Sequence, residues 1–145
     1  KQASIKIKPT GSNMKILKKR IRVIVEKTNT GFSAYPFDEQ IPAGTTGRTI
    51  SELQDNILEV LNFYFEEKGY IIRKENIAIE IDLQQFFQYY RVLNARHLAE
   101  KIGMNPTLLS QYVSGKKKPS QAQSQRIIDG IQNIGKELAE LSFIH

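Results

Sequence analysis

Hydrophobic and polar residues alternate at several places in the first half of the chain, and this pattern predicts strands. The segment Ile21–Lys27 is short and rich in β-branched residues, which is typical of a strand. Residues 28–31 (TNTG) form a turn signal, so residues 32–35 (FSAY) are expected to pair with the first strand as a hairpin. Residues 42–47 predict a short edge strand, and residues 77–82 (IAIEID) predict a further strand through their alternating isoleucines.

Between these strands the apolar residues repeat at helical spacing. The stripe consists of Leu53, Ile57, Val60, Leu61 and Tyr64. Thr49 precedes this stripe and Glu52 follows three residues later, which predicts an N-terminal capping box. Gly69 is expected to end the helix. Residues 14–82 are therefore predicted to form an α+β domain, in which one helix packs on a small, mostly antiparallel sheet.

The second half of the chain shows only helical patterns, each preceded by a polar cap. The four predicted caps are Asp82, Asn94, Asn105 and Ser120. Gly103 separates the second helix from the third, and Pro106 occupies the first position of the third, where a missing N–H is tolerated. We therefore expect residues 83–145 to form an all-α domain that contains a helix-turn-helix.

The short helix predicted over residues 106–114 has an apolar and a hydrophilic side. Leu109, Tyr112 and Val113 are expected to face the interior. The other side carries small polar groups and one amide, which suit base edges in the major groove of DNA. The candidate DNA-contacting residues are Asn105, Thr107, Leu108, Ser110 and Gln111, followed by Lys116, Lys117 and Lys118 for the phosphate backbone.

These assignments have structural alternatives. In the alternative for Asn105, the residue caps the helix and does not contact a base. In the alternative for Leu108, the side chain belongs partly to the core and does not touch a thymine methyl group. The run of three lysines can be an ordinary solvated loop.

The last helical pattern continues past what one small domain needs. Its apolar residues, spaced by four and three, are Ile127, Ile131, Ile134, Leu138 and Leu141. The first part of this seam is expected to close the helix-turn-helix core. Ile134, Leu138 and Leu141 are candidate contacts of a homodimer or a larger oligomer, and the alternative is that they fold back on the aromatic residues near position 87. A dimeric repressor would place its two recognition helices, residues 106–114 of each copy, about 34 Å apart, one turn of DNA.

Charge is distributed unevenly along the chain. The net charge is +6, yet residues 14–82 carry ten basic and eleven acidic residues, whereas residues 83–145 carry eight basic and four acidic ones. A basic C-terminal third indicates a polyanionic partner for that third, and the alternative is a basic surface without a partner.

The composition of the chain argues against catalysis and against metal binding. The chain has no cysteine, which excludes disulfides and thiol catalysis and fits a reducing cytoplasm, and no apolar stretch reaches membrane-spanning length. Acidic residues of the first half are scattered, and adjacent pairs such as Asp38–Glu39 point in different directions. His97 has no cysteine or carboxylate cluster beside it. We therefore expect no catalytic residue, no metal and no cofactor, with a nuclease built on the first half as a competing hypothesis.

Residues 1–13 have two interpretations. Met14 follows Gly-Ser-Asn and looks like a natural start, which makes residues 1–13 a leader or an artificial extension. Alternatively, Ile5 and Ile7 alternate with lysines and form an extra strand.

Residues 98–120 (LAEKIGMNPTLLSQYVSGKKKPS) resemble the helix-turn-helix of the Cro-like phage-repressor family. The match comprises the first helix and its turn, the polar recognition helix, and the glycine followed by three basic residues, Pro and Ser. The family commonly has a glutamine after the cap, where this chain has Pro106, so base recognition is expected to depend on the following positions.

The whole chain from Met14 onward resembles HicB-type antitoxins that carry a C-terminal helix-turn-helix. The residues that support this are IRVIVEKTNTGFSAY, the loop after it, and TISELQDNILEVLNFYFEE, with IIDGIQNIGKELAEL at the end. The resemblance implies a non-catalytic, degenerate RNase H-like fold for residues 14–82. It also implies a HicA-type mRNA-cleaving toxin as the partner that this domain masks.

The sequence therefore predicts a cytoplasmic, antitoxin-like repressor that binds double-stranded operator DNA through residues 83–145 and represses its own operon. The alternative is a stand-alone helix-turn-helix transcription factor, whose N-terminal domain dimerises or senses a ligand.

Overall fold

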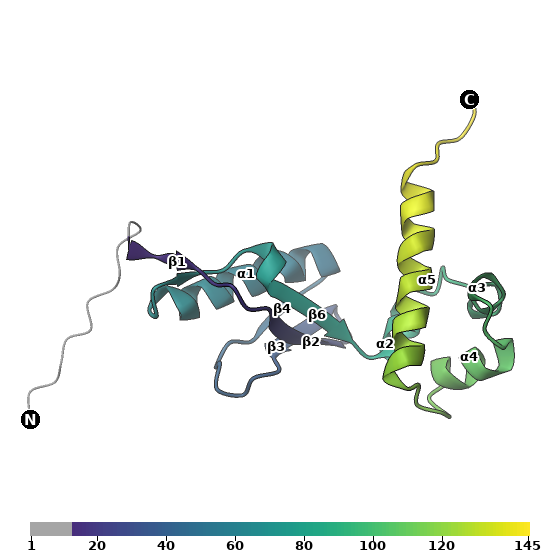
Figure 1. Ribbon diagram of the computed structural model, residues 1–145, viewed down its shortest axis with the longest axis horizontal. Helices are drawn as coiled ribbons and strands as arrows, with labels where there is room; N and C mark the ends of the chain where they lie inside the picture. Colours follow the sequence, from purple (N-terminus) through teal and green to yellow (C-terminus); the bar gives the residue numbers. More distant parts are fainter. Residues whose placement is uncertain (1–12) are drawn as a thin grey trace, which may run out of the picture. The chain divides into compact units, whose positions relative to one another are not determined.

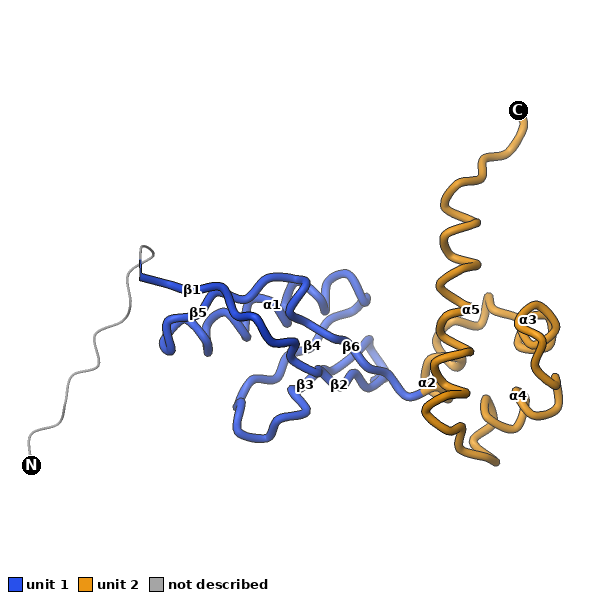
Figure 2. Tube along the Cα trace, viewed as in Figure 1, with its two compact units in different colours: residues 1–82 blue, residues 83–145 orange. Residues whose placement is uncertain are grey.

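The computed structural model describes residues 13–145 of the chain (Figure 1). The two interpretations of residues 1–13 concern a segment that lies, up to residue 12, outside the described residues. The fold is mixed α+β, and the chain divides after Asp82 into two compact units (Figure 2). We call the part up to Asp82 unit 1 and residues 83–145 unit 2, and we describe each by itself.

Unit 1 is built around a four-stranded sheet in the order β4-β3-β2-β6. Its strands are β2 (Ile21–Lys27), β3 (Phe32–Pro36), β4 (Thr45–Gly47) and β6 (Ile77–Ile81). The β2–β3 and β3–β4 pairs are antiparallel, as predicted. The β6 strand pairs with β2 in parallel, because the chain returns to the sheet through a helical crossover rather than a hairpin. A separate parallel pair joins β1 (Lys15–Ile16) to β5 (Tyr70–Ile71), and neither strand was predicted.

The core of unit 1 lies between this sheet and helix α1 (Ile50–Glu66). Along β2 the side chains alternate, so that Ile21, Val23 and Val25 are buried while Arg22 and Glu26 are exposed. Helix α1 buries Leu53, Ile57, Leu61 and Phe65. The predicted stripe is thus correct for three residues, but Val60 and Tyr64 are only half-buried and Phe65 takes the last core position.

The start of α1 differs slightly from a standard capping box. The Thr49 side chain accepts a hydrogen bond from the Glu52 N–H at 3.1 Å, as predicted. The Glu52 carboxylate accepts from the N–H of Arg48 at 3.2 Å, one residue before the expected partner. Both bonds occupy N–H groups at the start of the helix, where an acidic side chain is also favoured by the helix dipole.

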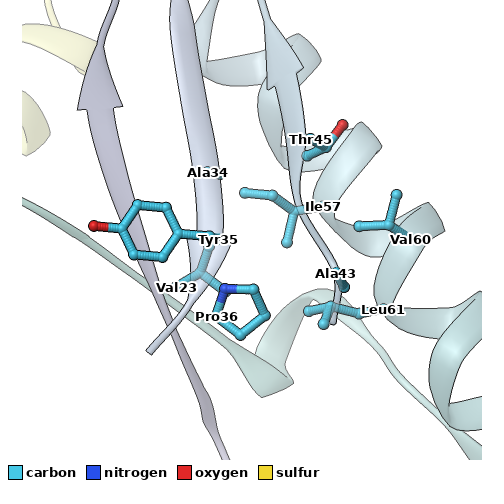
Figure 3. Close-up of a pocket in the computed structure, with 9 residues that line it drawn as sticks. All are labelled: Val23, Ala34, Tyr35, Pro36, Ala43, Thr45, Ile57, Val60 and Leu61. Atoms are coloured by element: carbon cyan, nitrogen blue, oxygen red, sulfur yellow. The ribbon is translucent and has the colours of Figure 1, made fainter. Parts of the chain in front are cut away.

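A narrow apolar gap remains between α1 and the sheet. Figure 3 shows Ile57, Val60 and Leu61 of the helix facing Ala34 of β3 and the segment that leads into β4. The gap has a volume of about 10 Å³, which is at the lower limit for a single water molecule. It is therefore a packing irregularity and is too small for a ligand.

Unit 2 consists of four helices around a smaller core. They are α2 (Leu83–Tyr89), α3 (Ala95–Ile102), α4 (Pro106–Val113) and α5 (Gln121–Ala139). The buried residues are Phe87, Leu98, Ala99, Met104, Leu109, Tyr112 and Ile127. The side chains of Asn94, Asn105 and Ser120 each accept a hydrogen bond from a backbone N–H of the following helix, which confirms these three predicted caps.

Candidate nucleic-acid interface

Helices α3 and α4 form a compact helix-turn-helix. Gly103 ends α3 in the left-handed conformation (φ 70°), which glycine adopts without the strain of a side chain. The next residue, Met104, is 5% exposed and holds the turn on the core. Asn105 then accepts hydrogen bonds from the N–H groups of Thr107 (2.8 Å) and Leu108 (3.3 Å) and begins α4. Gly103, Met104 and Asn105 thus each help to fix the direction in which α4 leaves the turn.

The two sides of α4 differ as the sequence predicts. Leu109 is fully buried and Tyr112 is 8% exposed, and both pack in the core of unit 2. Thr107 and Ser110 are exposed, and Gln111 is half-buried. The hydrophilic side therefore stays accessible while the apolar side anchors the helix.

Two of the predicted contact residues have structural roles as well. Leu108 is half-buried and packs against the core, so only part of its side chain is available to a partner. The side-chain oxygen Oδ1 of Asn105 is occupied by its two capping bonds, which leaves the side-chain nitrogen Nδ2 for a partner.

The three lysines lie in the loop between α4 and α5, and Lys116, Lys117 and Lys118 are all exposed. The loop begins tightly against the end of α4. The Lys117 N–H donates to the Gln111 carbonyl oxygen at 3.2 Å, and the Gly115 N–H donates to that of Tyr112 at 3.2 Å. These backbone bonds hold the first lysines next to the C-terminal end of α4.

Helix α5 holds the turn of the helix-turn-helix through Arg126. One guanidinium nitrogen of Arg126 donates to the carbonyl oxygens of Ile102 (2.9 Å) and Gly103 (2.8 Å). These carbonyls lie at the C-terminal end of α3, where unpaired acceptors and the helix dipole both favour a cation. No sequence motif marks this contact, because it joins residues more than twenty positions apart.

Two further features of α5 bring it close to α3. A Cβ atom added at Gly130 would collide with the Cγ2 atom of Ile102, so a larger residue there would force the Ile102 side chain to shift. Two helical turns further on, the carboxylate of Glu137 accepts a hydrogen bond from the ammonium group of Lys101 at 3.1 Å, and both side chains are exposed. Arg126, Gly130 and Glu137 therefore form one side of α5 that faces α3.

The proposed dimer contacts fall into two groups. Ile134 packs with Ile127 and Ile131 against the core of unit 2, so it belongs mainly to this core. Leu138 is 62% exposed and lies in the last turn of α5. The prediction that Leu141 continues the helical seam is wrong, because α5 ends at Ala139 and Leu141 follows it, 71% exposed.

The ionisable groups of unit 2 include one histidine beside a carboxylate and one tyrosine whose pKa is raised. His97 is exposed, and its Nδ1 atom lies 3.4 Å from a Glu100 carboxylate oxygen. Partial burial, and then the neighbouring Tyr89, raise the pKa of Tyr90. Within residues 13–145, no three histidine or acidic side chains are grouped as they are in a metal site. In the same part of the chain, no helix combines the length and apolar character needed to cross a membrane.

Comparison with known proteins adds no relative. No family model matches the chain, and no curated protein matches it significantly.

Proposed function

We propose that this chain is a cytoplasmic, antitoxin-like transcriptional repressor in which unit 2 binds double-stranded operator DNA. The observation that supports this is the exposed hydrophilic side of α4 beside three exposed lysines. The polar groups of α4 contact base edges in the major groove, and the lysines contact the phosphates that flank it. No residue performs chemistry, and no cofactor or metal takes part.

Within this proposal, Gln111 and Lys117 have different roles that binding measurements separate. Gln111→Ala should weaken binding to the cognate operator by about 1–3 kcal/mol and leave binding to random DNA nearly unchanged. Lys117→Ala should weaken binding to both DNAs and reduce the log–log salt slope by about one unit. Lys136→Ala is the matched control, because it removes an exposed lysine from the same unit on helix α5.

The operator itself can be selected from random duplexes by the wild-type protein. Equal loss on cognate and random DNA for Gln111→Ala would remove its base-reading role. Unchanged binding after replacement of all three lysines would reject α4 and its loop as the DNA interface.

For unit 1 we propose a HicB-like, degenerate RNase H-like domain that masks a HicA-type toxin. The resemblance of the sequence motivates the partner, and the charge of α1 supports a basic one. Within Ile50–Glu66 the helix carries Glu52, Asp55, Glu59 and Glu66 and no basic residue. Glu59 and Glu66 are exposed, so their side of α1 offers a negative surface to a small basic ribonuclease.

Co-expression with the neighbouring open reading frame tests this half of the proposal. We expect the full chain to restore growth, and the double variant Glu59→Lys with Glu66→Lys to lose rescue. Glu75→Lys, an exposed acidic residue outside α1, is the matched control. Operator binding without any rescue or captured toxin would instead support a stand-alone transcription factor.

The repressor is proposed to act as a homodimer through the end of α5 and the residues that follow it. Leu138, Leu141, Phe143 and Ile144 are all more than half exposed, which is unusual for so many large apolar residues in one short segment. Leu138→Glu should shift the protein toward monomer in sedimentation equilibrium and weaken operator binding. A wild-type protein that is already monomeric when bound to DNA would contradict the dimer.

A further inference from the structure

Unit 1 carries a concentrated positive charge of its own, between β1 and β2. We call residues 15–22 the basic segment; its cations are Lys15, Lys18, Lys19, Arg20 and Arg22, and all five are exposed. Leu17 and Ile21 of the same segment are buried, at 8% and 4% exposure, and fix it to the core. Apolar anchors thus alternate with cations that face solvent.

A buried asparagine holds the backbone of this segment. Asn76 is 8% exposed, and its amide nitrogen donates to the carbonyl oxygens of Leu17 (2.7 Å) and Lys19 (3.2 Å). Its side-chain oxygen accepts from the Arg73 N–H at 2.9 Å. The Leu17 N–H also donates to the Ile71 carbonyl oxygen at 3.0 Å. The cations are therefore presented by an ordered backbone, which lowers the entropy cost of binding.

An exposed aromatic ring lies beside these cations. Phe37 follows β3 and is 57% exposed, and its N–H donates to the Arg22 carbonyl oxygen at 2.9 Å. The Arg22 guanidinium lies over the ring, 4.0 Å from its centroid. Phe37 lines a groove of about 160 Å³ together with Lys19, Arg20, Ile21, Arg22, Asp38 and Ile41. The groove thus combines an aromatic surface, three cations, the carboxylate of Asp38 and an apolar floor.

The cations of the segment differ in whether they are paired. Arg22 donates twice to the Glu80 carboxylate, at 2.8 Å each, so its charge is largely neutralised. Among residues 13–145, Lys18, Lys19 and Arg20 form no ion pair. Since residues 14–82 have nearly balanced charge, this positive cluster reflects segregation from the acidic helix α1 rather than an overall excess.

We propose that the basic segment and Phe37 form a second binding site, for single-stranded nucleic acid. A base stacks on the face of Phe37 opposite the Arg22 guanidinium, while the flanking phosphates contact Lys18, Lys19 and Arg20. An unpaired base is required, because the faces of paired bases inside a duplex are covered by their neighbours. Sites for single strands combine these same two elements, a cationic groove and an aromatic platform. The function goes beyond operator binding, which uses a duplex and α4.

The test measures fluorescence anisotropy of labelled oligothymidylate and oligouridylate with the full chain. Phe37→Ala should weaken binding about tenfold, and Phe37→Trp should retain it, because stacking requires an aromatic face. Lys19→Ala and Arg20→Ala should each weaken binding and lower the log–log salt slope by about 0.7. Lys68→Ala is the matched control, since Lys68 is exposed in unit 1 and does not line the groove.

Duplex operator binding, measured on the same proteins, keeps this proposal separate from the function of unit 2. The triple replacement of Lys116, Lys117 and Lys118 by alanine should abolish operator binding and preserve oligonucleotide binding. Oligonucleotide binding that is lost in the triple variant, or that is unchanged by Phe37→Ala, would overturn the site. If Lys19→Ala weakened binding to the duplex operator but not to the oligonucleotides, the proposed site would also be overturned. The basic segment would then be assigned to contacts with DNA that flanks the operator.

Discussion

Within its described residues 13–82, unit 1 packs a seventeen-residue helix on a four-stranded sheet and buries twelve apolar residues, whereas unit 2 buries seven among its four helices. Because its core is smaller, unit 2 depends more on polar contacts at the ends of its helices. In unit 2 these contacts are the three asparagine and serine caps and the Arg126 bonds to the end of α3. These contacts satisfy backbone N–H and C=O groups that have no partner within their own helix.

The two units also present positive charge in different ways. In unit 2 the lysines follow a helix whose last turn orders the start of their loop. In unit 1 the cations alternate with buried anchors, and a buried amide fixes their backbone. In both units, polar contacts hold the backbone beside a basic cluster, and the following predictions test those contacts in each unit.

The largest effect is expected from Leu109→Ala in the centre of α4. Leu109 is fully buried, so its truncation should lower the free energy of unfolding by about 2–5 kcal/mol. Because unit 2 has few other buried residues, hydrogen exchange should show loss of protection in α3 and α4. The amides of β2 should keep their protection. Loss of protection in β2 of equal size would show that the units unfold together. Leu108→Ala, on the same helix but half-buried, should cost less.

A smaller effect is expected from Asn76→Ala in unit 1. The change removes two bonds to buried or half-buried carbonyl groups and the bond from the Arg73 N–H, so the free energy of unfolding should fall by about 1–3 kcal/mol in chemical denaturation. Asn56→Ala is the matched control, because Asn56 also donates to a carbonyl, that of Thr46 at 2.8 Å, but at an exposed position. Water replaces the Asn56 bond, so equal losses for the two variants would contradict a special role for burial.

Local patterns explain which elements were predictable. Strands β2 and β3, helix α1 and the caps Asn94, Asn105 and Ser120 are correctly predicted, because each depends on neighbouring residues. The hydrophilic side of α4 was predictable for the same reason.

Contacts between distant residues explain what was missed. The β1–β5 pair consists of two-residue strands, which are too short to show a period. The parallel placement of β6, the buried amide of Asn76 and the Arg126 contact each depend on chain segments far apart in sequence. A seam of apolar residues also continued to Leu141 in the sequence, although the helix ends earlier. Spacing alone does not show where a helix ends.

Arg126→Ala is expected to have a moderate effect on unit 2. The two bonds to Ile102 and Gly103 join exposed groups, so their loss should lower the free energy of unfolding by about 1 kcal/mol. Because the contact positions the turn before α4, the preference for cognate over random DNA should fall while the salt slope stays unchanged. A drop of the slope by about one unit would instead identify Arg126 as a phosphate contact. Arg126→Lys should restore only part of the preference, since an ammonium group lacks the planar geometry of a guanidinium.

The smallest effect concerns the exposed pair of Arg22 and Glu80. Hydrogen bonds from the Arg22 guanidinium, and then its charge, hold the pKa of the Glu80 carboxyl below its usual value. A carboxyl whose pKa is lowered by folding stabilises the protein above its unfolded pKa, and this contribution is lost as the pH falls through the lowered value. Arg22→Gln should therefore raise the pKa of Glu80 in an NMR titration. The stability difference between variant and wild type should narrow below about pH 4. A difference that stays constant across this range would mean that Arg22 stabilises unit 1 through its contact with the Phe37 ring, which does not titrate.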